Sequence, residues 1–132
     1  IILLMTNKPI IILTGDPQSI FFEIFFKSLK LNNFKNPLIL ISSLKILEFH
    51  MKKNRFKRNI RSINLNNLKN NKLDNKVINL INVDYYNNIK SKKKIDQTSN
   101  YLKRCFDTAF KILKMGVTNK FINGPINKSN FK

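Results

Sequence analysis

The chain has few of the residues that build metal centres and covalent cross-links. Its 132 residues include one cysteine, Cys105, and one histidine, His50. A lone cysteine can form neither an internal disulfide nor a thiolate cluster, and these two residues with scattered carboxylates lack the spacing of a zinc site. The composition therefore excludes a disulfide-rich scaffold, predicts no metal site within the chain and favours a reducing compartment, which we take to be the cytoplasm. We expect His50 at a surface or boundary position.

Long apolar runs and glycine-rich motifs are also missing. No apolar run approaches the length needed to span a membrane, and the opening run Ile1–Met5 lacks the basic region and cleavage site of a signal peptide. We interpret residues 1–4 as an upstream artefact, because Met5 begins a stretch typical of a natural start. Three glycines build no Gly-x-Gly-x-x-Gly motif, P-loop or nucleophile elbow. Residues 1–132 are expected to form a single α/β domain, since the chain is too short for two.

Acidic residues are scarce, with 7 Asp and Glu against 25 Lys and Arg, so the formal net charge is +18. A polyanion partner is one explanation of such a charge. The densest basic run, Lys52–Arg61, contains Phe56 and could contact phosphates while stacking a base. However, Asn, Ile and Phe are over-used together with Lys, as an AT-rich coding bias would produce. We favour that bias, and we interpret Lys52–Arg61 as a solvated helix end leading into an edge strand.

The stretch around which the chain is organised begins with the apolar run Ile10–Leu13, which is typical of a buried parallel strand. Gly15 permits a sharp turn directly after it. Asp16 is predicted to cap a helix over Pro17–Leu31, because its carboxylate can accept from the free N–H groups of the first turn. A turn of this kind places backbone donors at the edge of the sheet where α/β folds bind anions.

The remaining elements continue an α/β pattern. A second buried strand is predicted at Pro37–Ser42, followed by a helix that Ser42 or Ser43 caps, then a polar loop over Asn64–Lys76. A strand is predicted at Val77–Val83. The last helix, Asp96–Met115, carries one apolar face that includes Cys105 and ends at Gly116. This order predicts a mostly parallel sheet with flanking helices, joined by right-handed crossovers.

A second glycine turn closes the chain, where the short apolar strand starting at Lys120 runs into Gly124-Pro125. The two turns could converge on one site at the same edge of the sheet. Asp16, Asn127 and Lys128 are the polar side chains that these turns would bring there, and we take them as candidate substrate-binding residues. A simple capping role for Asp16 is the competing interpretation.

Several of these segments resemble the 4-hydroxythreonine-4-phosphate dehydrogenase family. Ile12–Pro17, with Glu23 beyond it, is similar to the family's Thr-x-Gly-Asp/Glu-Pro-Ala-Gly-Ile-Gly-Pro-Glu signature, and Asn123–Lys128 is similar to its Thr-Gly-Pro-Ile-Asn-Lys motif. Two departures stand out: Gln18–Phe22 replaces the two glycines of the signature, and Asn123 replaces a threonine. Shorter resemblances lie between the motifs, in the strand Pro37–Ile41 and in the helix Ile95–Ile112 with Tyr101 and Ala109.

The resemblance implies a partial three-layer sandwich of the isocitrate/isopropylmalate dehydrogenase type. It also implies an NAD-dependent homodimer that uses a divalent metal (Zn, Mg or Co) to oxidise 4-phosphooxy-L-threonine to a β-keto acid that decarboxylates, in vitamin B6 biosynthesis. The family's metal ligands, histidines among them, follow the second motif, so we expect this chain to be an inactive N-terminal fragment. A small basic nucleic-acid-binding protein and a related phosphorylated-sugar-acid dehydrogenase are the alternatives.

Overall fold

A five-stranded, all-parallel sheet forms the centre of the molecule. The computed structural model describes residues 8–70, 72–86 and 95–126. The strand order is β3-β4-β2-β1-β5, and all pairs that join neighbouring strands are parallel. The predicted α/β class and mostly parallel sheet are therefore confirmed. The strands are β1 (Ile10–Leu13), β2 (Leu38–Ser42), β3 (Ile60–Ser62), β4 (Ile78–Asn82) and β5 (Lys120–Asn123).

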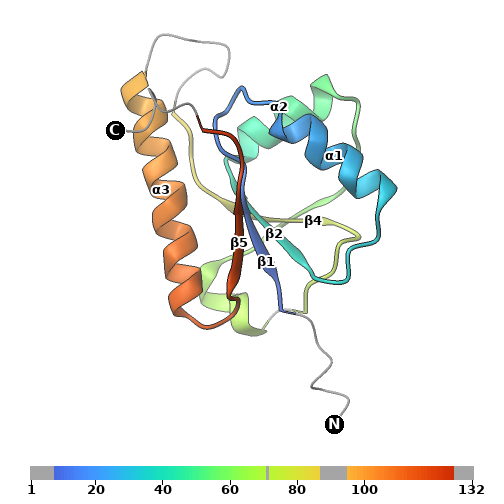
Figure 1. The fold of residues 1–132 in the computed structure, drawn as a ribbon, viewed down its shortest axis with the longest axis vertical. Coiled ribbons are helices and arrows are strands. Elements are labelled where there is room, and N and C mark those ends of the chain that lie inside the picture. Colours follow the sequence, from blue (N-terminus) through green and yellow to red (C-terminus); the bar gives the residue numbers. More distant parts are fainter. Residues whose placement is uncertain (1–7, 71, 87–94, 127–132) are drawn as a thin grey trace.

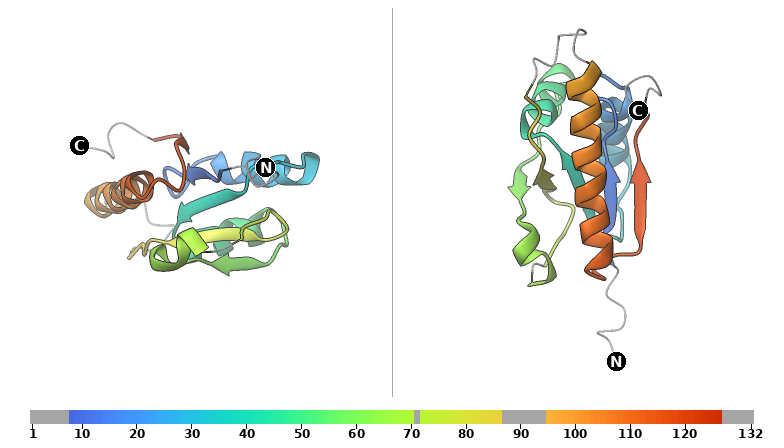
Figure 2. Two further views of the ribbon diagram at one scale, coloured as in Figure 1. Left: turned by 90° about the horizontal axis from the view of Figure 1, so that it is seen from below. Right: turned by 90° about the vertical axis from the view of Figure 1, so that its left-hand side faces the viewer.

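Helices cover both faces of the sheet. The left panel of Figure 2 looks along the strands and shows α3 on one face and α1 and α2 on the other. Figure 1 shows the same arrangement from the β5 edge of the sheet, with α3 on the left and α1 and α2 on the right. The helices are α1 (Phe21–Leu31), α2 (Leu44–Lys53) and α3 (Ile95–Lys114), with a 3₁₀ helix, η2, at Leu65–Asn70. None of the helices in the described part of the chain is both long and apolar enough to cross a membrane.

The core lies in two layers between the sheet and these helices. β1 and β2 are buried along almost their whole length, as continuous apolar strands of a sheet covered on both faces should be. From one side α1 contributes three phenylalanines and a leucine, and from the other α3 contributes the apolar face predicted from its sequence. The buried residues of these helices are Phe22, Phe25, Phe26, Leu29, Tyr101, Leu102, Cys105, Ala109 and Ile112.

The start of α1 differs from the prediction. The helix begins at Phe21 rather than Pro17, and its N-cap residue Ile20 makes no side-chain cap hydrogen bond, so Asp16 is not the N-cap. In a helix running from Pro17 the Phe21 N–H would donate to the Pro17 carbonyl. Instead Phe21 donates to Ser19 Oγ at 3.3 Å, while the Pro17 carbonyl is bound by His50. The four residues before α1 therefore form a turn of their own.

The polar stretch between β3 and β4 is more ordered than a plain loop. It contains η2, whose Leu68 is buried in the core. Near its end Asn75 accepts from the Leu38 N–H at 2.9 Å and donates to the Asn36 carbonyl at 2.9 Å, which fixes the entry to β2. The prediction of a loop over residues 64–76 was wrong for the part that forms η2. This helix is anchored by the buried Leu68 and has no regular apolar pattern from which it could be predicted.

The basic run Lys52–Arg61 has the structure that we favoured, a helix end that leads into an edge strand. It contains the last residues of α2 and leads into β3, which is an edge strand of the sheet. Phe56 is only 4% exposed and stacks on Phe26, with ring centroids 4.5 Å apart. Because this ring belongs to the core, it has no free face to offer a nucleic-acid base.

Candidate functional site

The turns after β1 and β5 meet at the carboxyl edge of the sheet. These strands are neighbours, with Leu13 in register with Asn123. Just beyond them the Gly124 N–H donates to the Leu13 carbonyl at 2.7 Å, and the Asp16 N–H donates to the Pro125 carbonyl at 3.0 Å. The two glycine turns are therefore joined backbone to backbone, as their positions in the sequence suggested.

Two glycines make this close approach possible. Gly15 has a φ of +79°, and a Cβ placed on it would lie 2.8 Å from the carbonyl carbon of Gly124. A Cβ on Gly124 would lie 2.6 Å from the carbonyl carbon of Thr14. Both distances are shorter than side-chain atoms tolerate against backbone, so the junction excludes any side chain at either position. We call Thr14–Asp16 with Gly124–Pro125 the glycine junction.

The glycine junction lies where the sheet reverses its direction of growth. From β1 the chain passes through α1 to β2 on one side, whereas it returns through α3, on the opposite face, to place β5 on the other side. Where the strand order of an open α/β sheet reverses in this way, a crevice lies outside the carboxyl ends of the adjacent strands. Open α/β sheets bind their ligands at such a crevice.

Buried polar groups brace the carboxyl end of β2 beside the junction. Thr14 Oγ1 donates to Ser42 Oγ at 3.3 Å, and Ser42 Oγ lies 3.4 Å from Tyr101 Oη. The Ser43 N–H donates to the same Tyr101 oxygen at 3.0 Å. Burial raises the pKa of the Tyr101 hydroxyl far above its ordinary value, so it stays protonated and acts as a structural hydrogen-bonding group. This network links β1, β2 and α3.

The structure tests the placement of one of the three predicted site residues. Asp16 is half-buried at the junction, with its backbone bound to Pro125. Asn127 and Lys128 lie outside the described residues, directly after the part of the second turn that is described. The glycine turns are thus brought together, while the substrate-binding roles of Asp16, Asn127 and Lys128 stay predictions.

His50 is a buried residue beside the site that sequence reasoning missed. Its side chain is 5% exposed, which corrects the expected surface or boundary position. The ring stacks on Phe22 with centroids 4.2 Å apart, and Nε2 lies 2.6 Å from the Pro17 carbonyl oxygen. The Phe22 ring that buries it comes from α1, an element distant in sequence, so local patterning carried no signal for this contact.

Protonation of His50 is expected to destabilise the fold. Burial lowers the pKa of its imidazole from the ordinary value of 6.5, with neighbouring Lys53 adding to the effect and the Pro17 hydrogen bond opposing it. Because the unfolded chain binds this proton more readily, the stabilisation is present above about pH 6.5 and is lost as the pH falls through the native pKa. Urea unfolding at about pH 8 and pH 5.5 should show this loss, and His50→Gln should show less of it. An equal loss in the variant would assign the effect to other groups.

Cys105 is expected to be chemically inert in the native protein. Its thiol is buried on the core side of α3, as predicted, and burial raises its pKa to about 12. Since only the thiolate reacts, a disulfide reagent such as DTNB should modify Cys105 very slowly at pH 8 and promptly after unfolding in urea. Rapid modification of the folded chain would show that α3 does not pack as described.

The described residues do not supply a metal site. Among them, no three His, Cys, Asp or Glu side chains are grouped so that they could hold an ion. The donor set at the glycine junction consists of backbone groups and the single carboxylate of Asp16. These groups can hydrogen-bond a polar ligand.

Solved structures with the same fold identify the architecture. The chain superposes on a putative 4-hydroxythreonine-4-phosphate dehydrogenase from Salmonella typhimurium with a TM-score of 0.77, at 23% identity over 94% of this chain. Dehydrogenases of the same name from Klebsiella pneumoniae and Burkholderia phymatum give TM-scores of 0.75 and 0.69, at 21% and 19% identity, each again over 94% of this chain. The chain has the fold of these dehydrogenases. No protein-family model and no curated protein matches it.

The likeness extends over only part of each dehydrogenase. The chain spans 39% of the length of the Salmonella and Klebsiella proteins and 38% of the Burkholderia protein. Within that part, the dehydrogenase fold accounts for the parallel sheet and its flanking helices. The glycine junction, described above from this chain alone, lies at the carboxyl edge of the shared sheet.

Proposed function

We propose that this chain is the N-terminal part of an NAD-dependent dehydrogenase that oxidises 4-phosphooxy-L-threonine, with decarboxylation of the product, in vitamin B6 biosynthesis. The observation that carries the proposal is the glycine junction, where two motifs distant in sequence meet at the carboxyl edge of a dehydrogenase fold. The family resemblance of both motifs supports the choice of substrate. In this proposal the whole protein is a cytoplasmic homodimer.

The proposed substrate carries a phosphate, a carboxylate and an ammonium group, and the site residues can be assigned by charge. Asp16 would pair with the ammonium group, while Lys128 would pair with one of the anionic groups and Asn127 would hydrogen-bond beside it. We assign no residue of this chain to NAD. The described residues offer no ligand cluster for the divalent metal that the resemblance implies. In this proposal its ligands are the residues that follow the second motif in the family.

Binding of the substrate to the chain can be followed residue by residue. Titration of ¹⁵N-labelled protein with 4-phosphooxy-L-threonine should shift the amides of Gly15, Asp16 and Gly124 at concentrations where L-threonine and inorganic phosphate do not. Asp16→Asn should weaken the shifts without unfolding the chain. Shifts spread over surface lysines, or equal shifts with phosphate alone, would contradict the proposal.

A catalytic assay separately tests the proposal that the metal ligands lie outside this chain. The chain, supplied with the substrate, NAD and zinc or magnesium, should form no NADH, because the metal ligands are assigned elsewhere. A metal-dependent rise in NADH above that of a protein-free control would refute this part of the proposal.

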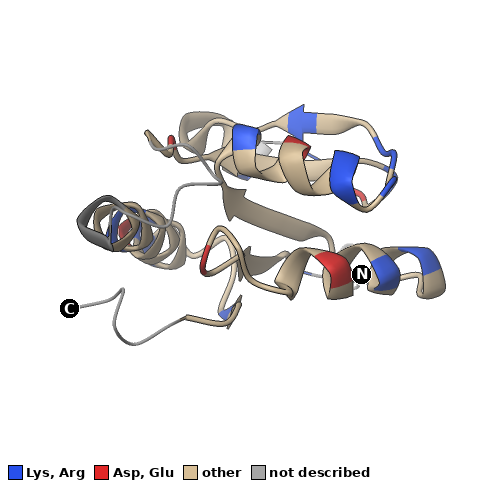
Figure 3. Ribbon diagram, turned by 90° about the horizontal axis from the view of Figure 1, so that it is seen from above, with Lys and Arg blue, Asp and Glu red and all other residues tan. Residues whose placement is uncertain are grey.

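Nucleic-acid binding is the second candidate, and the net charge of +18 favours it. Figure 3 shows Lys and Arg spread over helices on both faces and over the β3 edge, rather than gathered on one element. Non-specific binding that weakens steeply with salt would follow from charge alone. A preference for one sequence, lost when Lys57 and Arg58 are both replaced by Ala, would support a nucleic-acid function. A related phosphorylated-sugar-acid dehydrogenase would be recognised instead by tighter binding of its own substrate at the glycine junction.

A further inference from the structure

The loop between β1 and α1 carries Asp16 and is held from two directions. On the β5 side, the Asp16 N–H donates to the Pro125 carbonyl at 3.0 Å. On the α2 side, the carbonyl of the next residue, Pro17, is bound by His50. We propose that His50 is a positioning residue, which fixes the loop so that Asp16 is held at the glycine junction. What this does for substrate binding rests on the proposed function, whereas the fixing of the loop does not.

The contact is a directed hydrogen bond rather than incidental packing. The Nε2···O distance is 2.6 Å, and because a carbonyl can only accept, Nε2 must carry the hydrogen. The ring itself cannot turn away, since it lies flat on Phe22 at an interplanar angle of 5° and meets the edge of Phe49 at 89°. Two aromatic contacts therefore hold the imidazole in one orientation, and its hydrogen bond fixes the position of the Pro17 carbonyl.

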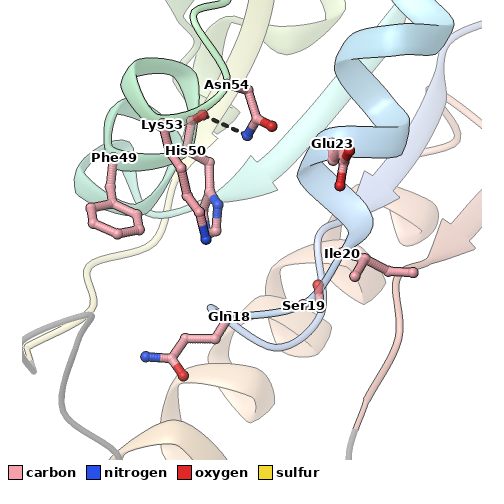
Figure 4. Close-up of a pocket in the computed structure, with 8 residues that line it drawn as sticks. All are labelled: Gln18, Ser19, Ile20, Glu23, Phe49, His50, Lys53 and Asn54. Carbon is pink, nitrogen blue, oxygen red and sulfur yellow. Dashed lines mark hydrogen bonds between the residues drawn. The ribbon is translucent and has the colours of Figure 1, made fainter.

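Space around the loop explains why such a contact is needed. A pocket of about 420 Å³ separates the loop residues Gln18–Ile20 from Phe49 and Lys53 on α2. Figure 4 shows the two walls of this pocket, with His50 reaching from α2 towards the loop. The hydrogen bond from His50 joins the loop to α2 at the side of this gap.

The local sequence also leaves the loop dependent on outside contacts. The N-cap residue of α1, Ile20, makes no side-chain cap hydrogen bond, and the turn before it is closed by the Ser19 N–H donating to the Asp16 carbonyl at 3.1 Å. The Pro17 carbonyl bonds His50 on α2 rather than the Phe21 N–H, and residues 16–19 form a turn outside α1. Loss of His50 should therefore free Pro17 and let the Asp16 turn sample other conformations.

Three variants distinguish the loss of loop positioning by His50 from a general loss of fold stability. His50→Phe retains a ring for stacking but removes the donor, whereas His50→Gln places an amide nitrogen close to the position of Nε2. Asn54→Ala is the matched control, because Asn54 donates to the His50 carbonyl at 2.8 Å and its loss weakens the end of α2 without touching Pro17.

The readout is amide hydrogen exchange of Asp16 relative to Leu40 in the central strand, measured without ligand. We expect His50→Phe to accelerate Asp16 exchange about tenfold more than Leu40 exchange, the factor for losing one hydrogen bond. His50→Gln should restore most of the protection, and Asn54→Ala should leave the ratio unchanged. An unchanged ratio in His50→Phe, or no rescue by His50→Gln, would overturn the proposal.

Adding 4-phosphooxy-L-threonine then tests the consequence for binding. If the wild-type chain binds it, His50→Phe should require roughly tenfold more ligand for the same Asp16 shift, and His50→Gln should recover the affinity. Equal affinity in all three proteins would contradict positioning for the substrate. If the wild-type chain does not bind, the proposed function fails while the exchange result still decides the role of His50.

Discussion

Replacing Gly15 by alanine is expected to cost more than about 3 kcal/mol of unfolding free energy, whereas the same change at Gly116 should cost only about 1–2 kcal/mol. Both glycines have a left-handed backbone, with φ of +79° and +77°. At Gly15 the new Cβ would meet the backbone of Gly124 and Pro125, while at Gly116 nothing lies within 4 Å. Both variants share the penalty of a left-handed alanine. The difference between their unfolding free energies therefore measures the steric clash at the glycine junction.

Urea unfolding followed by circular dichroism supplies both free energies under identical conditions. Gly124→Ala adds an independent check, because its Cβ would clash with Thr14 from the other side of the junction. It should resemble Gly15→Ala in cost. Similar small costs at all three positions would mean that the two turns do not touch.

Removing one oxygen from Tyr101 is expected to have the second largest effect. Tyr101→Phe preserves the buried ring but leaves the Ser43 N–H, whose bond to Tyr101 Oη is 3.0 Å long, without its acceptor. An unsatisfied buried donor costs about 1–3 kcal/mol. Loss of this brace should also weaken the contact between α3 and the carboxyl end of β2, next to the glycine junction.

Tyr85→Phe is the control for the Tyr101 variant. Tyr85 is also buried, but its hydroxyl bonds the partly exposed Thr98 hydroxyl at 3.1 Å, and water can replace that partner. Its loss should cost about 0.5–1.5 kcal/mol, as for a typical hydrogen bond. Thermal or urea unfolding of both variants compares their losses of stability. A Tyr101 variant as stable as the wild type would show that the Tyr101 hydrogen bonds do not stabilise the fold.

The parts of the fold that follow from local pattern could be predicted from the sequence. The buried run Ile10–Leu13 is β1 with the predicted bounds, because a short β-branched segment bounded by Pro and Gly has few alternatives. Ser43 caps α2 by accepting from the Ile46 N–H at 3.3 Å. Gly116, with its positive φ, follows the end of α3 as a C′ residue should.

Two of the errors, at the start of α1 and at His50, arose where contacts between distant segments overrule local preference. Asp16-Pro17 is a good helix start on its own, but here its backbone bonds Pro125 and His50 and α1 begins four residues later. The burial of His50 depends on Phe22 from α1 and was likewise invisible in the sequence around it. Both errors lie beside the glycine junction, where two turns pair through their backbones in place of regular secondary structure.

The meeting of the two turns is the claim on which the proposed site and function depend, and nuclear Overhauser spectroscopy tests it directly. The account predicts cross-peaks between the α-protons of Gly15 and those of Gly124, together with slow exchange of the Asp16 and Gly124 amides that bridge the junction. Absence of those cross-peaks, with both amides exchanging as freely as in an open loop, would contradict it.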